Sequence, residues 1–302
     1  MDWTAEITAA RARIAGHTRV TPVARLNLAG FDLEVKLEQL QHTGSFKTRG
    51  AFNTLLSQTV PKAGVVAASG GNHGAAVGFA AAALGHDAHI YVPELAGPAK
   101  IALIERTGAT CHVVPGLYAD AFTAAEAYQT QTGAMQIHAY DAQGTVAGQG
   151  TCFAEWDDQG LRADTVLIAV GGGGLISGAL GWFGQSRKVV AVEPETCATL
   201  HTALIEGAPQ NVPISGVAAN ALGARRIGQI CFGLAQGAPS VTVTDAAILE
   251  AQHLLWREAR LLVEPGGACA LAALMSGAYV PATGEKIAVL VCGANISPDP
   301  FP

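Results

Sequence analysis

The sequence predicts an α/β fold with parallel-rich twisted sheets flanked by helices. Three observations lead to this prediction. From Gly64 onward, short β-branched apolar runs alternate with Ala-rich helical stretches, each run is bounded by Gly or Pro, and three of the runs end in a glycine-rich loop. Continuous apolar strands that are joined by helices are typical of parallel sheets buried on both faces.

Seven apolar runs predict the strands, in chain order. They are Gly64–Ser69, Ala88–Pro93, Ala109–Pro115, Met135–Tyr140, Thr165–Val170, Lys188–Pro194 and Lys286–Cys292. The stretches between them predict helices, of which GAAVGFAAAALG (74–85) and TDAAILEAQHLLWREARLL (244–262) are examples. No Pro/Ser-rich linker or internal repeat divides the chain, so composition alone sets no domain boundary.

Composition and charge restrict the possible partners. The 302 residues are half hydrophobic and 14% charged, with 36 glycines and a net charge of -6, which argues against a nucleic-acid surface. No apolar run reaches membrane-spanning length, the N-terminal segment has no secretory hydrophobic region, and the six cysteines show no metal-binding spacing. We expect a core-rich cytoplasmic protein with reduced thiols and a small-molecule partner.

The stretch HTGSFKTRGAFN (42–53) predicts the start of a helix with Ser45 as its N-cap. Lys47 and Arg49 then fall in the first turn, where the helix dipole disfavours cations, and no Asp or Glu occurs between Glu38 and Asp87. A lysine in such a cation-rich, acid-free setting with apolar neighbours should have a lowered pKa. A partly neutral amine suits Schiff-base formation and proton abstraction.

The loop SGGNHG (69–74) lies between a predicted strand and an Ala-rich helix. In open α/β sheets ligands bind at the carboxyl ends of strands, and the N–H groups of such a loop can hold a carboxylate. A tight turn with Asn72 as a helix cap is the alternative, although it leaves the adjacent pair Asn72 and His73 without a role.

The loop GGGGL (171–175) also follows a predicted strand. Four consecutive glycines make sense where backbone amides wrap closely around a phosphate. The loop is not a Walker loop and does not fit GxGxxG. A dinucleotide site stays an alternative, because Glu193 ends the next strand where a ribose-binding acid is expected.

The third loop, VLVCGANIS (289–297), places Cys292 at the end of a strand, where it could face a ligand or simply pack in the core. An activated lysine together with a phosphate-binding loop points to pyridoxal 5′-phosphate (PLP) as the cofactor.

Five motifs, GSFKTRGA, SGGNHG, GGGGLISG, VEPGGA and VCGAN, occur in this order along the chain. In the order and content of these motifs, the chain resembles the serine/threonine dehydratase (ammonia-lyase) family of fold-type II PLP enzymes, which is related to serine racemase. The resemblance implies the two-domain, tryptophan synthase β-like fold. Residues 1–42 and 141–302 would form a large cofactor-binding domain, and residues 43–140 a small inserted domain.

The resemblance also implies residue roles. Lys47 would form the Schiff base and act as the catalytic base, with Phe46 packed beside the cofactor ring. Asn72 would bind the ring 3′-oxygen, Cys292 would face the pyridine nitrogen, and Glu264 would approach the ring. The phosphate would be held by Gly171, Gly172, Gly173 and Gly174, with Leu175 beside them. The substrate carboxylate would be received by Ser69, Gly70, Gly71, Asn72 and His73.

Two positions depart from the racemase pattern. The acid/base serine of racemases is replaced by Gly70, so Lys47 is the single predicted base, which favours elimination over racemisation. The metal-binding aspartate is replaced by Thr199, six residues after Glu193, and we therefore predict no divalent metal site. A neutral thiol at Cys292 is a weak partner for the pyridine nitrogen and also suits β-elimination.

These observations predict a PLP-dependent carbon-oxygen lyase that converts a β-hydroxy amino acid, L-serine or L-threonine by default, to a 2-oxo acid and ammonia. A dehydratase of 3-hydroxyaspartate or phenylserine is the nearest alternative, and an acidic substrate would need a cation such as Arg49 or the pair Arg225–Arg226. Serine racemase and a nucleotide-dependent oxidoreductase are further alternatives. Family analogy predicts a homodimer, with no nucleic-acid or membrane partner.

Overall fold

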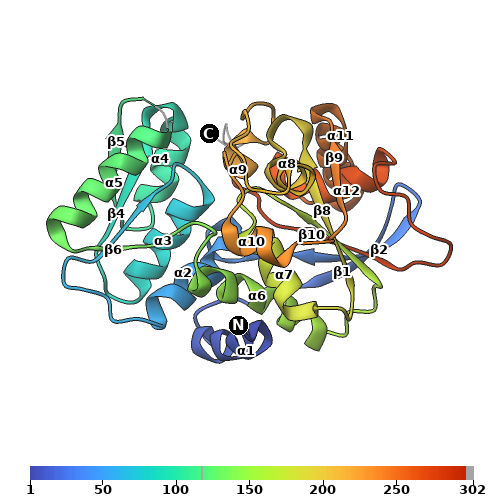
Figure 1. Ribbon diagram of the computed structural model, residues 1–302, viewed down its shortest axis with the longest axis horizontal. Coiled ribbons are helices and arrows are strands. Elements are labelled where there is room, and N and C mark those ends of the chain that lie inside the picture. Colours follow the sequence, from blue (N-terminus) through green and yellow to red (C-terminus); the bar gives the residue numbers. More distant parts are fainter. Residues whose placement is uncertain (117, 297–302) are drawn as a thin grey trace.

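The computed structural model describes residues 1–116 and 118–296, and these form two sheets (Figure 1). The six-stranded sheet has the order β1-β2-β10-β7-β8-β9, and the four-stranded sheet has the order β5-β4-β3-β6. The strands are β1 (Val23–Leu28), β2 (Phe31–Leu37), β3 (Val65–Ala68), β4 (Ala88–Pro93), β5 (Thr110–Val114), β6 (Met135–Gln136), β7 (Thr165–Ala169), β8 (Lys188–Pro194), β9 (Ser240–Val243) and β10 (Ile287–Val291).

The predicted α/β class is confirmed. Each of the seven predicted apolar runs contains a strand, although Met135–Tyr140 yields only the two residues of β6. The strand pairs of the described residues are parallel except the hairpin of β1 and β2, which the prediction missed together with β9. The hairpin turns at Ala29 and Gly30, both with positive φ (52° and 83°), as a two-residue primed turn requires.

Helices cover both sheets (Figure 1). They are α1 (Trp3–Ile14), α2 (Lys47–Leu56), α3 (Asn72–Ala83), α4 (Pro98–Glu105), α5 (Tyr118–Thr132), α6 (Gln143–Asp158), α7 (Gly174–Phe183), α8 (Thr199–Glu206), α9 (Ala219–Leu222), α10 (Gln229–Leu234), α11 (Asp245–Ala259) and α12 (Pro265–Met275). The two helices quoted from the sequence correspond to α3 and α11. Among the described residues, none of the helices has the length and apolarity that a membrane crossing needs.

Each sheet has its own hydrophobic core. The strands β7 and β10 are buried along their whole length, as expected for central strands of a parallel sheet. Each fully buried Leu or Ile there, such as Leu167 or Leu290, stabilises the fold by roughly 1.5–3 kcal/mol.

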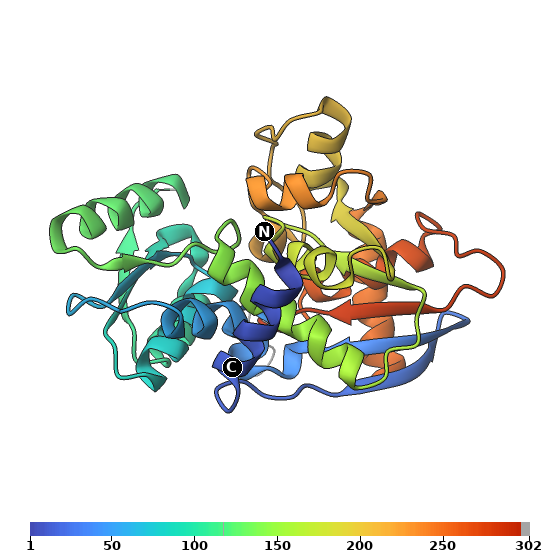
Figure 2. The same ribbon diagram turned by 60° about the horizontal axis from the view of Figure 1, so that its bottom comes forward.

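The helix α6 joins the two halves of the molecule by packing against α1, α2 and α7. Figure 2 shows the N-terminal helix α1 lying over the middle of the molecule, between the two sheets. The contact of α2 with α6 requires glycine, because a Cβ at Gly148 would lie 2.6 Å from the Cα of Gly50. The helix that begins with Lys47 is thus held directly against the six-stranded half.

Candidate active site

The predicted site residues converge where three parallel strands end. The loop after β3 leads into α3, the glycine loop after β7 leads into α7, and Cys292 follows β10, while Lys47 begins α2. One cavity is lined by residues from all of these segments. Its lining includes Phe46, Lys47, Asn72, Gly171, Gly172, Gly173, Gly174, Leu175, Glu264 and Cys292. The structure therefore brings together every residue predicted to contact the cofactor.

Among the described residues, Lys47 is the only lysine that lines this cavity. Its Nζ donates a hydrogen bond to the carbonyl of Ala139 at 2.8 Å and lies 5.1 Å from the ring centre of Phe46. Loss of hydration lowers the pKa of Lys47 to about 8, although Cys292 and Glu264 raise it. The lowered pKa was predicted from nearby cations and apolar neighbours, and burial is the cause that lowers it.

The predicted N-cap at Ser45 is wrong. The helix α2 begins at Lys47 with Phe46 in the N-cap position and no capping side chain, and the hydroxyl of Ser45 is buried without a hydrogen-bond partner among the described residues. Ser45 instead forms an isolated β-bridge with Gly293, and the N–H of Phe46 donates to the carbonyl of Cys292. The segment before Lys47 is thereby tied to the end of β10.

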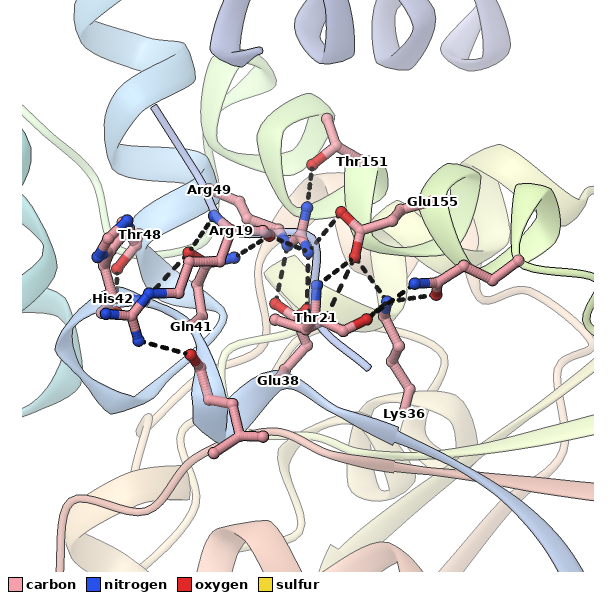
Figure 3. A network of polar contacts seen from close by, with 12 residues as sticks. Arg19, Thr21, Lys36, Glu38, Gln41, His42, Thr48, Arg49, Thr151 and Glu155 are labelled. Carbon is pink, nitrogen blue, oxygen red and sulfur yellow. Dashed lines mark hydrogen bonds and ion pairs between the residues drawn. The ribbon is translucent and has the colours of Figure 1, made fainter. Parts of the chain in front are cut away.

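Arg49 is not the unpaired cation that the local sequence suggested. Its guanidinium donates two hydrogen bonds to the carboxylate of Glu38, both at 2.8 Å, and a third to Glu155 at 2.9 Å (Figure 3). Lys36 donates to the other oxygen of Glu155 at 2.6 Å, so two cations balance two anions in the interior. Arg49 is 1% exposed and is therefore not available to bind an acidic substrate.

The glycine loop is tightly enclosed. A Cβ at Gly171 would lie 2.9 Å from the carbonyl oxygen of Leu222, and one at Gly174 would lie 2.9 Å from the Cα of Tyr140. Gly173 has a φ of 94°, in the region that favours glycine. The first N–H groups of α7 have no partner inside the helix, so the loop and the helix dipole suit a phosphate.

Asn72 lies at the centre of a side-chain network in the cavity. Its Nδ2 donates to Glu264 at 2.6 Å, and its Oδ1 accepts a hydrogen bond from Asn295 at 2.6 Å. Burial raises the pKa of Glu264 to about 7, against the opposing effects of Asn72, Lys100 and Lys47. Asn295 belongs to the motif VCGAN, but no role was predicted for it from the sequence.

The loop predicted to receive the substrate carboxylate lies beside this network. The N–H of Gly71 donates to the hydroxyl of Ser69 at 3.2 Å, and the ring of His73 contacts the carbonyl of Ile137 at 2.9 Å. Burial lowers the pKa of His73 to about 3, so its ring is neutral. A Cβ at Gly70 would lie 2.6 Å from the Cβ of Ala96, so the site has no room for the serine of racemases.

Cys292 is a neutral thiol. Its Sγ donates to the carbonyl of Gly266 at 3.4 Å, and burial together with the charge of Glu264 raises the pKa of Cys292 above its usual range. A carboxylate at this position would hold a pyridine nitrogen in its protonated form, whereas a neutral thiol cannot.

Glu193 has a structural role at the start of α8. Its carboxylate accepts hydrogen bonds from the N–H groups of Leu200 at 2.8 Å and His201 at 2.7 Å, and from the hydroxyl of Thr199 at 3.2 Å. The fully buried carboxylate is thus occupied and cannot bind a ribose, so the dinucleotide alternative is wrong. In the part of the chain that the structure describes, no three His, Cys, Asp or Glu residues gather into a metal site.

Comparison with known proteins agrees with this geometry. A family model described as pyridoxal-phosphate dependent enzyme matches residues 14–293. A phenylserine dehydratase of Ralstonia pickettii is 33% identical over 300 residues, which are 96% of this chain and 92% of that protein. An L-threonine ammonia-lyase of Thermotoga maritima is also 33% identical, over 89% of this chain and 68% of that protein.

Solved structures show the same similarity. Maize serine racemase superposes with a TM-score of 0.92 at 30% identity, covering 98% of this chain and 94% of that one. A threonine deaminase from T.th. superposes with a TM-score of 0.89 at 34% identity, covering 98% and 99%. Together with the lysine, the glycine loop and the strand-end cysteine in one cavity, these matches show that the chain belongs to the family of pyridoxal-phosphate dependent enzymes.

Proposed function

We propose that this protein is a PLP-dependent lyase that converts a β-hydroxy amino acid to a 2-oxo acid and ammonia by β-elimination. The observation that carries the proposal is a single amine of lowered pKa, Lys47, in a cavity that borders a loop whose position 70 has no side chain and no room for one. One base supports removal of the Cα proton, whereas racemisation needs a second group on the other face of Cα.

The residues of the cavity fit the cofactor. We propose that Gly171, Gly172, Gly173, Gly174 and Leu175 hold its phosphate, since they line the cavity and the packing around the four glycines leaves no room for side chains. When bound, the cofactor supplies an electron sink that makes the Cα proton of the substrate acidic. Phe46 would pack beside its ring, Asn72 would bind its 3′-oxygen, and Glu264 would approach the ring.

Lys47 moves the proton in this proposal. Its amine takes the proton from Cα. In the cofactor-free protein, the carbonyl of Ala139 accepts a hydrogen bond from this amine. The backbone of Ser69, Gly70, Gly71, Asn72 and His73 receives the substrate carboxylate, which fixes Cα in front of the amine. The neutral thiol of Cys292 would face the pyridine nitrogen, where it would favour loss of the β-hydroxyl.

We further propose the domain division and the cellular context. Residues 1–42 and 141–302 form the large domain and residues 43–140 the small one, which is supported by the four-stranded sheet that lies within residues 65–136. A reducing cytoplasm is supported by six free cysteines. A homodimer rests on the family resemblance, and light scattering of the purified protein tests it.

Turnover of a panel of substrates tests the function. The purified protein, loaded with PLP, is mixed with L-serine, L-threonine, phenylserine and 3-hydroxyaspartate, and the 2-oxo acid and ammonia are measured. We expect both products in equal amounts from at least one member, with no D-amino acid formed. Release of a D-amino acid without oxo acid contradicts the proposal and favours a racemase.

The glycine loop gives a prediction about cofactor binding. Replacing Gly171 by alanine drives a Cβ against the carbonyl oxygen of Leu222, and such overpacking typically costs about 1–3 kcal/mol. We expect PLP affinity to fall by about 5- to 150-fold, measured by equilibrium dialysis. The control is Gly233→Ala in α10, where a Cβ meets nothing within 4 Å, and it should bind PLP like the wild type.

Glu264 gives a prediction about pH dependence. Its negative charge raises the pKa of Lys47, so Glu264→Gln should move that pKa below about 8 in the cofactor-free protein. Neutral Lys47 then persists to lower pH, and its acylation by an anhydride should accelerate near neutral pH, as measured by peptide mass spectrometry. The substitution keeps an oxygen that can accept from Asn72, and an unchanged acylation profile contradicts the coupling.

A further inference from the structure

A second cavity, of about 220 Å³, lies next to the candidate active site. Asn72 and Glu264 line both cavities, so the two are contiguous. Gly71, from the loop proposed to receive the substrate carboxylate, also lines the second cavity. A substrate held by that loop therefore has room to extend its side chain into this space.

The second cavity contains a buried cation without a direct partner. Lys100, in the first turn of α4, is 8% exposed and lines the cavity. Among the described residues it makes no hydrogen bond or ion pair. Burial lowers the pKa of Lys100, and the charge of Glu264 opposes this effect. An ammonium that is largely shielded from water and has no protein partner gains a charge-assisted hydrogen bond when an anion binds there.

The other charged groups leave this cavity with an excess of positive charge. Among the described residues, the carboxyl of Glu264 is the one acid in the lining, and it already accepts from Asn72 and faces Lys47. Arg106, an exposed residue just beyond the end of α4, adds a second cation to the lining. Arg225 and Arg226, the other cations considered from the sequence, are exposed and do not line either cavity.

We propose that Lys100 binds a carboxylate carried on the β-carbon of the substrate, so that the preferred substrate is a dicarboxylic β-hydroxy amino acid of the 3-hydroxyaspartate class. This inference rests on the proposed β-elimination and names its substrate. The α-carboxylate sits at the loop that contains Gly71, and the second carboxylate, two carbons away, lies toward Lys100. Both anion sites border the same cavity, as such a short molecule requires.

The reaction balances without a further reactant. The substrate loses its Cα proton and its β-hydroxyl as water, and the resulting enamine becomes an imine by taking up a proton at Cβ. Water then adds to the imine carbon, and the products are 2-oxosuccinate and ammonium. No electron acceptor or donor is needed, because the β-carbon is reduced while the α-carbon is oxidised.

Steady-state kinetics of the holoenzyme test the role of Lys100. We expect Lys100→Gln to lower kcat/KM for 3-hydroxyaspartate about 10- to 100-fold more than kcat/KM for L-serine, as expected from loss of a charge-assisted hydrogen bond. Lys62→Gln, which removes an exposed lysine outside both cavities, is the matched control and should change neither value. The L-serine reaction shows in the same sample whether the variant is folded.

Ligand binding provides a readout without turnover. L-aspartate and L-alanine have no β-hydroxyl to lose, and calorimetry gives their affinities for the holoenzyme. We expect the wild type to bind aspartate more tightly than alanine, and Lys100→Gln to remove most of that difference. Equal weakening of both ligands would show that Lys100 receives the α-carboxylate or acts through Glu264, and it would overturn the inference.

The two proposals fail in distinguishable ways. If the wild type eliminates water from serine, threonine or phenylserine but not from 3-hydroxyaspartate, the lyase function stands and the acidic substrate is wrong. A preference for phenylserine that Lys100→Gln leaves unchanged would assign the cavity to an apolar ring, packed against Leu103 and Leu262. If no β-hydroxy amino acid reacts, the function itself is wrong.

Discussion

Replacing Arg49 by methionine is expected to lower the free energy of unfolding by about 3–5 kcal/mol. The substitution leaves the carboxylate of Glu38 without its two-point partner, and both groups are almost completely inaccessible to water. Since the guanidinium also donates to Glu155, α2 loses one of its polar connections to α6 (Figure 3). Chemical denaturation monitored by circular dichroism measures the change.

A surface ion pair provides the control for this prediction. Arg11 pairs with Asp158 at a position where both side chains are about half exposed, so Arg11→Met should change the unfolding free energy by about 0–1 kcal/mol. Adding Glu38→Gln to Arg49→Met should recover part of the loss, because the unpaired charge is then removed. A loss in Arg49→Met no larger than that in Arg11→Met contradicts the buried network.

The network also determines a pH dependence. Burial alone would raise the pKa of Glu38, but the charge and hydrogen bonds of Arg49 lower it below the usual 4.5. The unfolded chain therefore binds more protons than the folded one just below pH 4.5, and stability rises with pH in that range. The contribution is complete above pH 4.5 and is lost as pH falls through the lower pKa of the folded state. The difference between the wild type and Arg49→Met should shrink accordingly in acid.

Replacing Lys47 by alanine is expected to lower kcat by at least about 10²–10⁴-fold, the contribution typical of a positioned base. The same change removes the lysine side chain that lines the cofactor cavity. The fold should survive, because the lost contacts are a single hydrogen bond to Ala139 and the packing on Phe46. Stopped-flow or steady-state assay of oxo-acid release gives the effect.

Lys62→Ala is the control for this second prediction, because it removes an exposed lysine that lies outside the cavity lining. It should retain wild-type turnover. Turnover by Lys47→Ala within tenfold of the wild type would mean that another group removes the Cα proton, and the proposed mechanism would be wrong.

Strands that are completely buried were predicted from the sequence, whereas some strands that are only partly buried were missed. Strands such as β7 and β10 are continuous apolar runs because helices cover both of their faces. The hairpin of β1 and β2 and the short strand β9 keep polar residues on an accessible side, so their composition resembles that of loops. The turn of the hairpin contains Ala29 and Gly30, and the prediction did not use this glycine as a turn signal.

The candidate site was predicted to a similar extent. The order of the motifs predicted Lys47, Asn72 and the glycine loop as site residues. Side-chain contacts between residues far apart in the sequence could not be predicted. Arg49 and Glu155 are 106 residues apart, and Asn72 and Asn295 are 223 apart, so neither pairing could be read from local spacing. Lys100 lies in a helical segment without a recognisable motif, and its proposed role follows from the cavity that it lines.

One measurement tests the central claim most directly. The purified protein is incubated with PLP, reduced with borohydride, digested and mapped by mass spectrometry. We predict the reduced cofactor on the peptide that contains Lys47, together with loss of the visible absorbance band and of all β-elimination activity. Attachment to a different lysine, such as Lys100, or a protein that takes up no cofactor, would contradict the assignment of this cavity as the catalytic centre.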